Sequence, residues 1–173
     1  YVRQGEHVSD VLHLRVRMSP PSLRIFLVST SSILSVSSST APNMDNASLT
    51  LSPNVLQLQT YPEDPDPVVL RQQQYTLWLQ ARLGELTTSR TPTDVVTISS
   101  DNGRSLVIKT SSFATLQAVL ANTLYTPYAD VSGLEEILAE LHIVKNGEAS
   151  SRRVSEAYIP VKVDADEDTI RLS

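Results

Sequence analysis

The sequence predicts an all-β domain, a sandwich of two sheets whose core is closed at one end by one short helical turn. Two observations lead to this fold class. Apolar and polar residues alternate in several short stretches, as they do in strands with one buried face. The 173-residue chain also holds ten prolines against only five glycines. Together with many serine, threonine, valine and leucine residues, this composition favours β structure with short connections.

The clearest elements lie in the middle of the chain. Val96 and Ile98 alternate with polar neighbours and predict a strand. The Asp-Asn-Gly triplet at 101–103 tolerates positive φ, so it predicts a tight hairpin turn. Leu106 and Ile108 resume the alternation on the returning strand. These residues therefore predict a β-hairpin.

A short helix is expected after this hairpin. Ser112 is suited to cap it, because a serine hydroxyl accepts hydrogen bonds from N–H groups of a first helical turn. Apolar residues at spacings of three and four share one helical face: Phe113, Leu116, Val119 and Leu120. A corner at 130–133 then leads into a strand whose alternating residues are Ile137, Ala139, Leu141 and Ile143.

The first part of the chain, residues 1–58, predicts a smaller, degenerate β unit that packs end to end against the main sandwich. Strands are expected at 8–18 and 23–28. Residues 29–40 are rich in serine and threonine, which leaves two interpretations open: an edge strand with its loop, or a linker that carries O-glycans. Asn46 begins an Asn-Ala-Ser sequon, a glycosylation site if the protein is secreted.

The main sandwich is expected at 59–165, with 166–173 starting a following linker or repeat. Its boundary lies at 61–67, where three prolines and three carboxylates interrupt regular structure. Strands are expected to resume at Val68, and one of them places Trp78 opposite a face formed by Tyr75, Leu77 and Leu79. The last strand alternates through Ala157, Ile159, Val161 and Val163.

Composition narrows the classes of function. A net charge of −5 gives no basic surface for nucleic acid, and no apolar run is long enough to span a membrane. The absence of cysteine excludes disulfides, thiolate metal sites and cysteine nucleophiles. Because the sequence starts at Tyr1, we expect it to be a segment of a longer protein.

Three motifs after residue 56 occur in the order found in one family. They are an Asp-Pro-Asp turn at 64–66, a short helix that runs on to Leu-Tyr-Thr-Pro at 124–127, and an Asp-x-x-Gly corner at 130–133. In this order the stretch 56–168 resembles the cadherin-like and bacterial immunoglobulin-like tandem repeats of large surface adhesins, which are related in architecture to chondroitin-sulfate-proteoglycan repeats. Glu135 departs from the pattern, because these repeats usually have an aspartate there.

The resemblance implies an immunoglobulin/cadherin-like β-sandwich in an extracellular or cell-surface protein. Such repeats are structural or adhesive modules that stack end to end with neighbouring repeats, assemble into fibres or arrays, and are often stiffened by calcium. Carboxylates in proline-restrained loops can supply the oxygen ligands that calcium requires. In the alternative interpretation they are solvated turn residues, because aspartate and proline favour turns without any metal. The candidate calcium ligands are Glu63, Asp64, Asp66, Asp130, Asp164, Asp166 and Asp168.

The sequence offers little support for catalysis. His7, His13 and His142 are scattered along expected outer faces, and neither a zinc-protease motif nor a nucleophile elbow is present. We therefore expect no enzyme, and no cofactor other than calcium. The alternative function is a carbohydrate-binding, lectin-like sandwich in which Trp78 stacks against a sugar; in the simpler interpretation Trp78 covers a neighbouring loop or packs in an interface.

Overall fold

The computed structural model describes residues 22–30, 32–38, 47–89 and 91–165. The strand expected at 8–18 lies outside these residues, as do five residues named as candidates: His7, His13, Asn46, Asp166 and Asp168. The described residues form a β-sandwich, so the predicted all-β fold class is confirmed.

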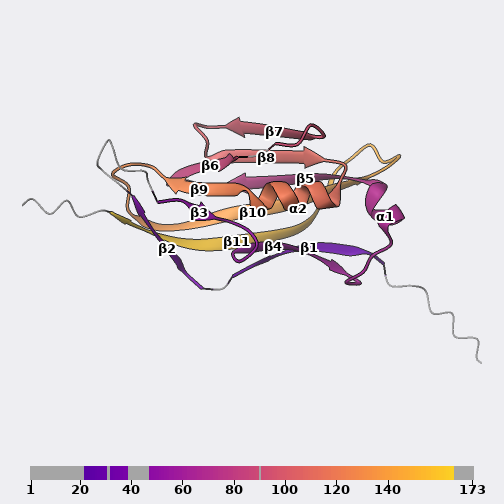
Figure 1. Cartoon of the computed structure of the whole chain (residues 1–173), viewed down its shortest axis with the longest axis horizontal. Coiled ribbons are helices and arrows are strands. Elements are labelled where there is room, and N and C mark those ends of the chain that lie inside the picture. Colours follow the sequence, from indigo (N-terminus) through magenta and orange to yellow (C-terminus); the bar gives the residue numbers. More distant parts are fainter. Residues whose placement is uncertain (1–21, 31, 39–46, 90, 166–173) are drawn as a thin grey trace, which may run out of the picture.

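The larger layer is a six-stranded sheet (Figure 1). In sheet order its strands are β2 (Leu34–Ser38), β11 (Arg152–Ala165), β10 (Gly133–Lys145), β5 (Gln73–Gln80), β8 (Ser105–Thr110) and β7 (Val95–Ser100). All neighbours in this order are antiparallel except β2 and β11, which run parallel.

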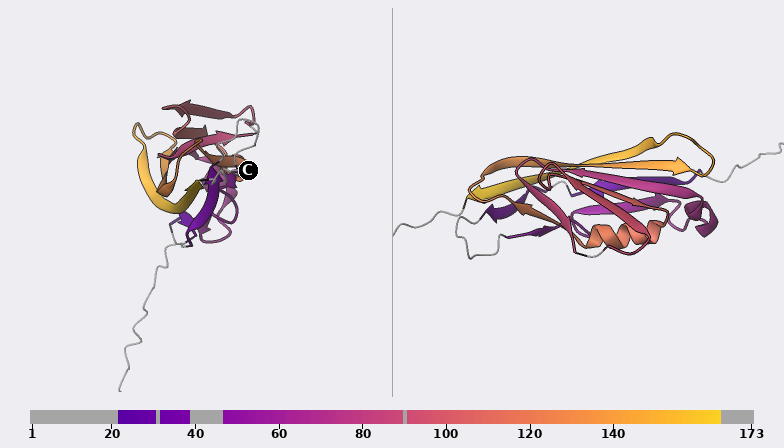
Figure 2. Two further views of the ribbon diagram at one scale, coloured as in Figure 1. Left: turned by 90° about the vertical axis from the view of Figure 1, so that its left-hand side faces the viewer. Right: turned by 90° about the horizontal axis from the view of Figure 1, so that it is seen from above.

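The second layer has three parts. One is a three-stranded sheet of β3 (Leu49–Thr50), β9 (Thr123–Pro127) and β6 (Gly84–Thr88), and another is the antiparallel pair β1 (Arg24–Ser29) and β4 (Leu56–Tyr61). The third is helix α2 (Phe113–Ala121), which lies in line with β9 in Figure 1. Seen from above, α2 and the long β10–β11 hairpin lie on opposite sides of the molecule (Figure 2). The helix is therefore part of this layer and covers area that β9 and β6 leave open.

The core lies between the two layers. Period-2 alternation on β5, β10 and β11 turns one residue in two inward, and these inward residues are buried and apolar along the middle of each strand. The second layer contributes Leu51, Leu56, Leu86, Leu116, Leu120 and Tyr125, all at most 1% exposed. Burial of this extent by alternating side chains is what holds the two layers together.

The hairpin and the helix cap form as predicted. β7 and β8 pair in antiparallel register, and residues 101–103 all have positive φ. The Ser112 side chain accepts a hydrogen bond from the Thr115 N–H at 3.2 Å. Of the four apolar residues expected on one face of α2, Leu116, Val119 and Leu120 are buried, and Phe113 packs against the Tyr75 ring.

The strand expected from Val96 and Ile98 forms as part of β7, but these two side chains lie on its exposed face. They are 56% and 46% exposed, whereas their neighbour Val95 is buried. The register explains the difference: Ile98 lies directly opposite Val107, and residues directly opposite one another on paired strands share a face. Val96 and Ile98 therefore lie on the outer face of the larger sheet.

Residues 67–71 also differ from the sequence analysis, which started a strand at Val68. They form α1 (Pro67–Arg71), a short helix capped by Asp66, whose side chain accepts a hydrogen bond from the Val68 N–H at 2.9 Å. Pro67 favours this start, because proline lacks the N–H that a first helical residue leaves unpaired.

The boundary expected near residue 58 does not divide two cores within the described part of the chain. β2 extends the larger sheet by pairing with β11, and β3 pairs with β9. Ile25, Leu27 and Val36 belong to the same hydrophobic cluster as the strands after residue 59. The described residues before 59 are thus layers of the sandwich itself, where end-to-end packing of a separate unit was expected.

Candidate functional site

The outer face of the larger sheet carries an apolar patch that reaches one edge. We call Trp78, Val96, Ile98 and Val107 the edge patch. Trp78 and Ile98 both lie directly opposite Val107, so the three side chains form a row across β5, β8 and β7. Trp78 is 47% exposed, while Val107 is buried beneath its neighbours. Outer faces of antiparallel sheets are usually polar, so this exposed apolar group is a candidate contact surface.

The edge patch ends at β7, the terminal strand of the larger sheet among the described residues. Its sequence is Val-Val-Thr-Ile-Ser-Ser, with neither a charge nor a proline. Terminal strands present unpaired N–H and C=O groups, and natural proteins usually protect them with lysine, proline or a bulge. β7 carries none of the residues that protect such an edge.

Trp78 also borders a pocket of about 150 Å³, whose polar lining residues are Gln80, Ser105 and Glu140. Its ring centroid is 6.0 Å from that of His142, with the planes tilted by 47°. An exposed indole beside a carboxylate and an amide has the chemistry needed for sugar stacking.

Glu140 is held by an ionic network on this face. Arg153 donates to Glu140 at 3.0 Å and also lies 2.9 Å from Glu156. The hydrogen bond from Arg153, followed by that from His142, lowers the pKa of Glu140. The carboxylate therefore stays ionised, and it acts as an acceptor.

The candidate calcium ligands within the described residues fall into two groups. Glu63, Asp64 and Asp66 lie between β4 and α1, and the Asp66 side chain caps that helix. Asp130 adopts positive φ just before β10, and Asp164 forms an ion pair with Lys162 at 2.7 Å. The first group is next to α1, while the second is at the end where β11 runs beside β2, at the opposite side of Figure 1.

The two groups are therefore too far apart to share one ion within this chain. Among the described residues, no group of three or more histidine, aspartate or glutamate side chains is arranged to hold a metal. Calcium binding at these positions stays a prediction.

The structure assigns Glu135 a role that the sequence did not reveal. Its carboxylate is only 2% exposed and accepts hydrogen bonds from the backbone N–H groups of Arg82 and Leu83 and from the Tyr125 hydroxyl, the last at 2.5 Å. Burial, followed by the hydrogen bond to Glu135, raises the pKa of Tyr125 well above its ordinary value. Glu135 thus fastens the β5–β6 turn to β9 and β10.

A signal for Glu135 was present in the sequence. It lies two residues before Ile137, in phase with the residues that the alternation of this strand places in the core. A carboxylate in that phase must find donors inside the protein.

Neither described helix has the length and apolar character needed to cross a membrane. Comparison with family models gives no match, and no curated protein matches the chain. Among solved structures, a cohesin module from a family 33 glycoside hydrolase of Clostridium perfringens ATCC13124 is similar to this chain, with a TM-score of 0.42 and 11% sequence identity. The match covers 83% of this chain and 98% of the module. A likeness this weak adds nothing on function, so the fold rests on the strand arrangement described above.

Proposed function

We propose that this chain is a structural assembly module of an extracellular or cell-surface protein, an immunoglobulin- or cadherin-like repeat without catalytic activity. Its neighbours would be copies of the same module or related repeats. The observation that carries the proposal is the β7 edge, which is paired on one side only among the described residues and is free of charge and proline.

The partner that suits this edge best is β7 of a second copy. A strand added to β7 gains backbone hydrogen bonds and covers Val96 and Ile98, which are otherwise half exposed. Because β7 has no charged residue, its six residues bring no like charges opposite one another, although each chain carries a net charge of −5. Antiparallel pairing of two identical strands gives a two-fold interface, the commonest symmetry of homo-oligomers.

The oligomeric state tests this proposal. Ile98→Lys places a charge on the proposed interface, and Gln117→Lys places the same new charge on the exposed side of α2 as a matched control. In sedimentation equilibrium over a concentration series, the wild-type chain and Gln117→Lys are expected to associate, whereas Ile98→Lys stays monomeric with an unchanged circular dichroism spectrum. A wild-type chain that is monomeric up to its solubility limit would contradict the proposal.

A second candidate function is supported by the exposure of Trp78 and by the pocket beside it. In this function the module binds a neutral oligosaccharide, which stacks on the indole. Replacement of Trp78 by alanine is then expected to abolish binding on a glycan array. Equal binding by the wild type and Trp78→Ala would eliminate this candidate.

A further inference from the structure

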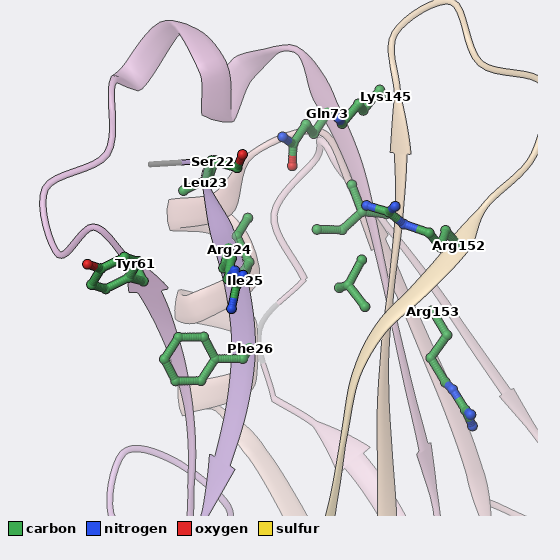
Figure 3. Close-up of a pocket in the computed structure, with 12 residues that line it drawn as sticks. Ser22, Leu23, Arg24, Ile25, Phe26, Tyr61, Gln73, Lys145, Arg152 and Arg153 are labelled. Carbon is green, nitrogen blue, oxygen red and sulfur yellow. The ribbon is translucent and has the colours of Figure 1, made fainter. Parts of the chain in front are cut away.

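A cleft of about 1020 Å³ opens at the end of the sandwich where β10 ends and β11 begins (Figure 3). One wall comes from the start of β1 and includes Arg24 and Ile25. The other wall comes from the larger sheet and includes Gln73, Lys145 and Arg152, from β5, β10 and β11. The volume is at the upper end of the range of roughly 300–1,000 Å³ that is typical of small-molecule sites.

The wall from the larger sheet continues the inner face of that sheet. Gln73 is in phase with the buried Tyr75 and lies directly opposite Lys145. Arg152 lies directly opposite the buried Ile143. Two cations and an amide therefore occupy positions where the strand alternation elsewhere places core residues.

Gln73 gives a second and independent indication of a ligand. Its side chain is 7% exposed, and its Oε1 atom accepts no hydrogen bond from the described residues. Figure 3 shows its amide directed into the cleft. A buried carbonyl without a donor is destabilising. The cleft thus presents an acceptor that a ligand with a hydroxyl or N–H group satisfies.

The charge of the cleft is the reverse of that of the whole chain. No aspartate or glutamate lines it, although the net charge of the protein is −5. Arg24, Lys145 and Arg152 form no ion pair within the described residues. The fourth basic residue, Arg153, pairs with Glu140 on the outer face. Three unpaired cations around one cleft favour an anionic ligand.

We propose that this cleft binds an acidic sugar, with its carboxylate between Arg152 and Lys145 and a hydroxyl donating to Gln73 Oε1. A fully ionised anion such as sulfate has acceptors only, so it leaves Gln73 unsatisfied. A neutral sugar leaves the cations unpaired. An acidic sugar holds its carboxylate and hydroxyls at fixed spacing on one ring, which reduces the entropy lost on binding. This site is separate from the edge patch and from Trp78.

Titration of the ¹⁵N-labelled full chain, followed by NMR, tests the ligand class. Glucuronate is expected to shift the side-chain amide signals of Gln73, whereas glucose and sulfate at equal concentration are not. An N-acetylated, amidated aspartyl-glycine peptide serves as the peptide probe. Sulfate binding as tight as that of glucuronate, or binding of the peptide without glucuronate, would overturn the proposal. So would the absence of any response to glucuronate.

Variants locate the site. Arg152→Gln is expected to lower glucuronate affinity at least tenfold, because it removes a charged donor. Lys109→Gln removes a cation from the outer face of the larger sheet and is expected to leave glucuronate affinity unchanged. Gln73→Met is expected to weaken glucuronate binding while raising the melting temperature. Loss of binding in Lys109→Gln, or full binding in Arg152→Gln, would assign the sugar to another surface.

Discussion

Glu135 and Gln73 are both buried polar residues of the larger sheet. Glu135 lies near the start of β10, whereas Gln73 lies on β5 beside the end of β10. The Glu135 oxygens accept hydrogen bonds from two backbone N–H groups and a tyrosine hydroxyl. Gln73 lies opposite the last residue of β10, and its carbonyl has no donor among the described residues. The same sheet thus has one buried polar group that is fully engaged and one that is not.

The difference separates a structural role from a binding role. A buried carboxylate surrounded by donors connects elements that are distant in sequence, and its removal leaves those donors unpaired. The carbonyl of a buried amide that has no donor gains no hydrogen bond in the free protein, so a ligand beside the unpaired cations is the simplest reason for its position. Three measurements on the two ends of β10 test this distinction.

Replacement of Glu135 is expected to have the largest effect. Glu135→Leu leaves the N–H groups of Arg82 and Leu83 and the Tyr125 hydroxyl without an acceptor, which we expect to lower the free energy of unfolding by about 3–5 kcal/mol. Glu136→Leu makes the same chemical change on the exposed face of β10 and serves as the control in urea unfolding. An equal loss of unfolding free energy in the two variants would show that the hydrogen bonds of Glu135 do not stabilise the fold.

Replacement of Gln73 is expected to act in the opposite direction. Gln73→Met keeps an unbranched side chain and removes the unsatisfied carbonyl, so we expect the free energy of unfolding to rise by about 1 kcal/mol. Gln74→Met, at the exposed neighbouring position, is the control for a general effect of methionine. A clear loss of stability in Gln73→Met would mean that the amide stabilises the fold. Gln73 would then have a structural role, as Glu135 does.

Stability at alkaline pH depends on two buried tyrosines, one beside Glu135 and one near Gln73. Tyr125 donates to Glu135, and Tyr75, two residues from Gln73, donates to the Leu70 carbonyl at 2.8 Å. Burial raises the pKa of Tyr75 to about 12, and the pKa of Tyr125 is raised further. In the unfolded chain a tyrosine has a pKa of about 10.

These raised values fix the sign of the pH dependence. Below pH 10 both states keep the phenol protons, so the contribution of the tyrosines to stability is complete. As the pH rises above about 10, the unfolded state loses its protons first, and the free energy of unfolding falls. Urea unfolding between about pH 9 and about pH 11 measures this fall, which should be less steep in Tyr75→Phe. An unchanged slope in that variant would contradict the assignment to Tyr75.

Local patterns predicted the local structure of this protein. The Asp-Asn-Gly turn, the Ser112 cap and the alternating strands depend on residues that are neighbours in sequence, and each formed as expected. The sequence did not show which face of β7 is buried, because Val95 and Val96 are both apolar and only the pairing with β8 decides which of them faces the core.

Contacts between distant residues could not be predicted in the same way. Two backbone N–H groups that donate to Glu135 lie more than fifty positions away in the sequence, and the cleft brings together the starts of β1, β5 and β11. The sequence contains Gln73 and Arg152 as ordinary polar residues, and only the register places both on the inner face. The candidate calcium ligands and Trp78 were chosen by residue type, which does not reveal such pairings.

The way β1 and β2 follow β11 has a mechanical consequence. The Leu27 N–H donates a hydrogen bond to the Ser155 hydroxyl, and the Ser29 hydroxyl donates to the Tyr158 carbonyl. Further along, β2 pairs in parallel with β11, from Leu34 opposite Val161 to Ser38 opposite Ala165. Because these strands run in the same direction, tension that draws Ser22 and Ala165 apart along the long axis slides them past one another. Sliding of this kind loads the hydrogen bonds between the strands together. Stretching between the first and last described residues therefore loads the contacts of β1 and β2 with β11 in shear.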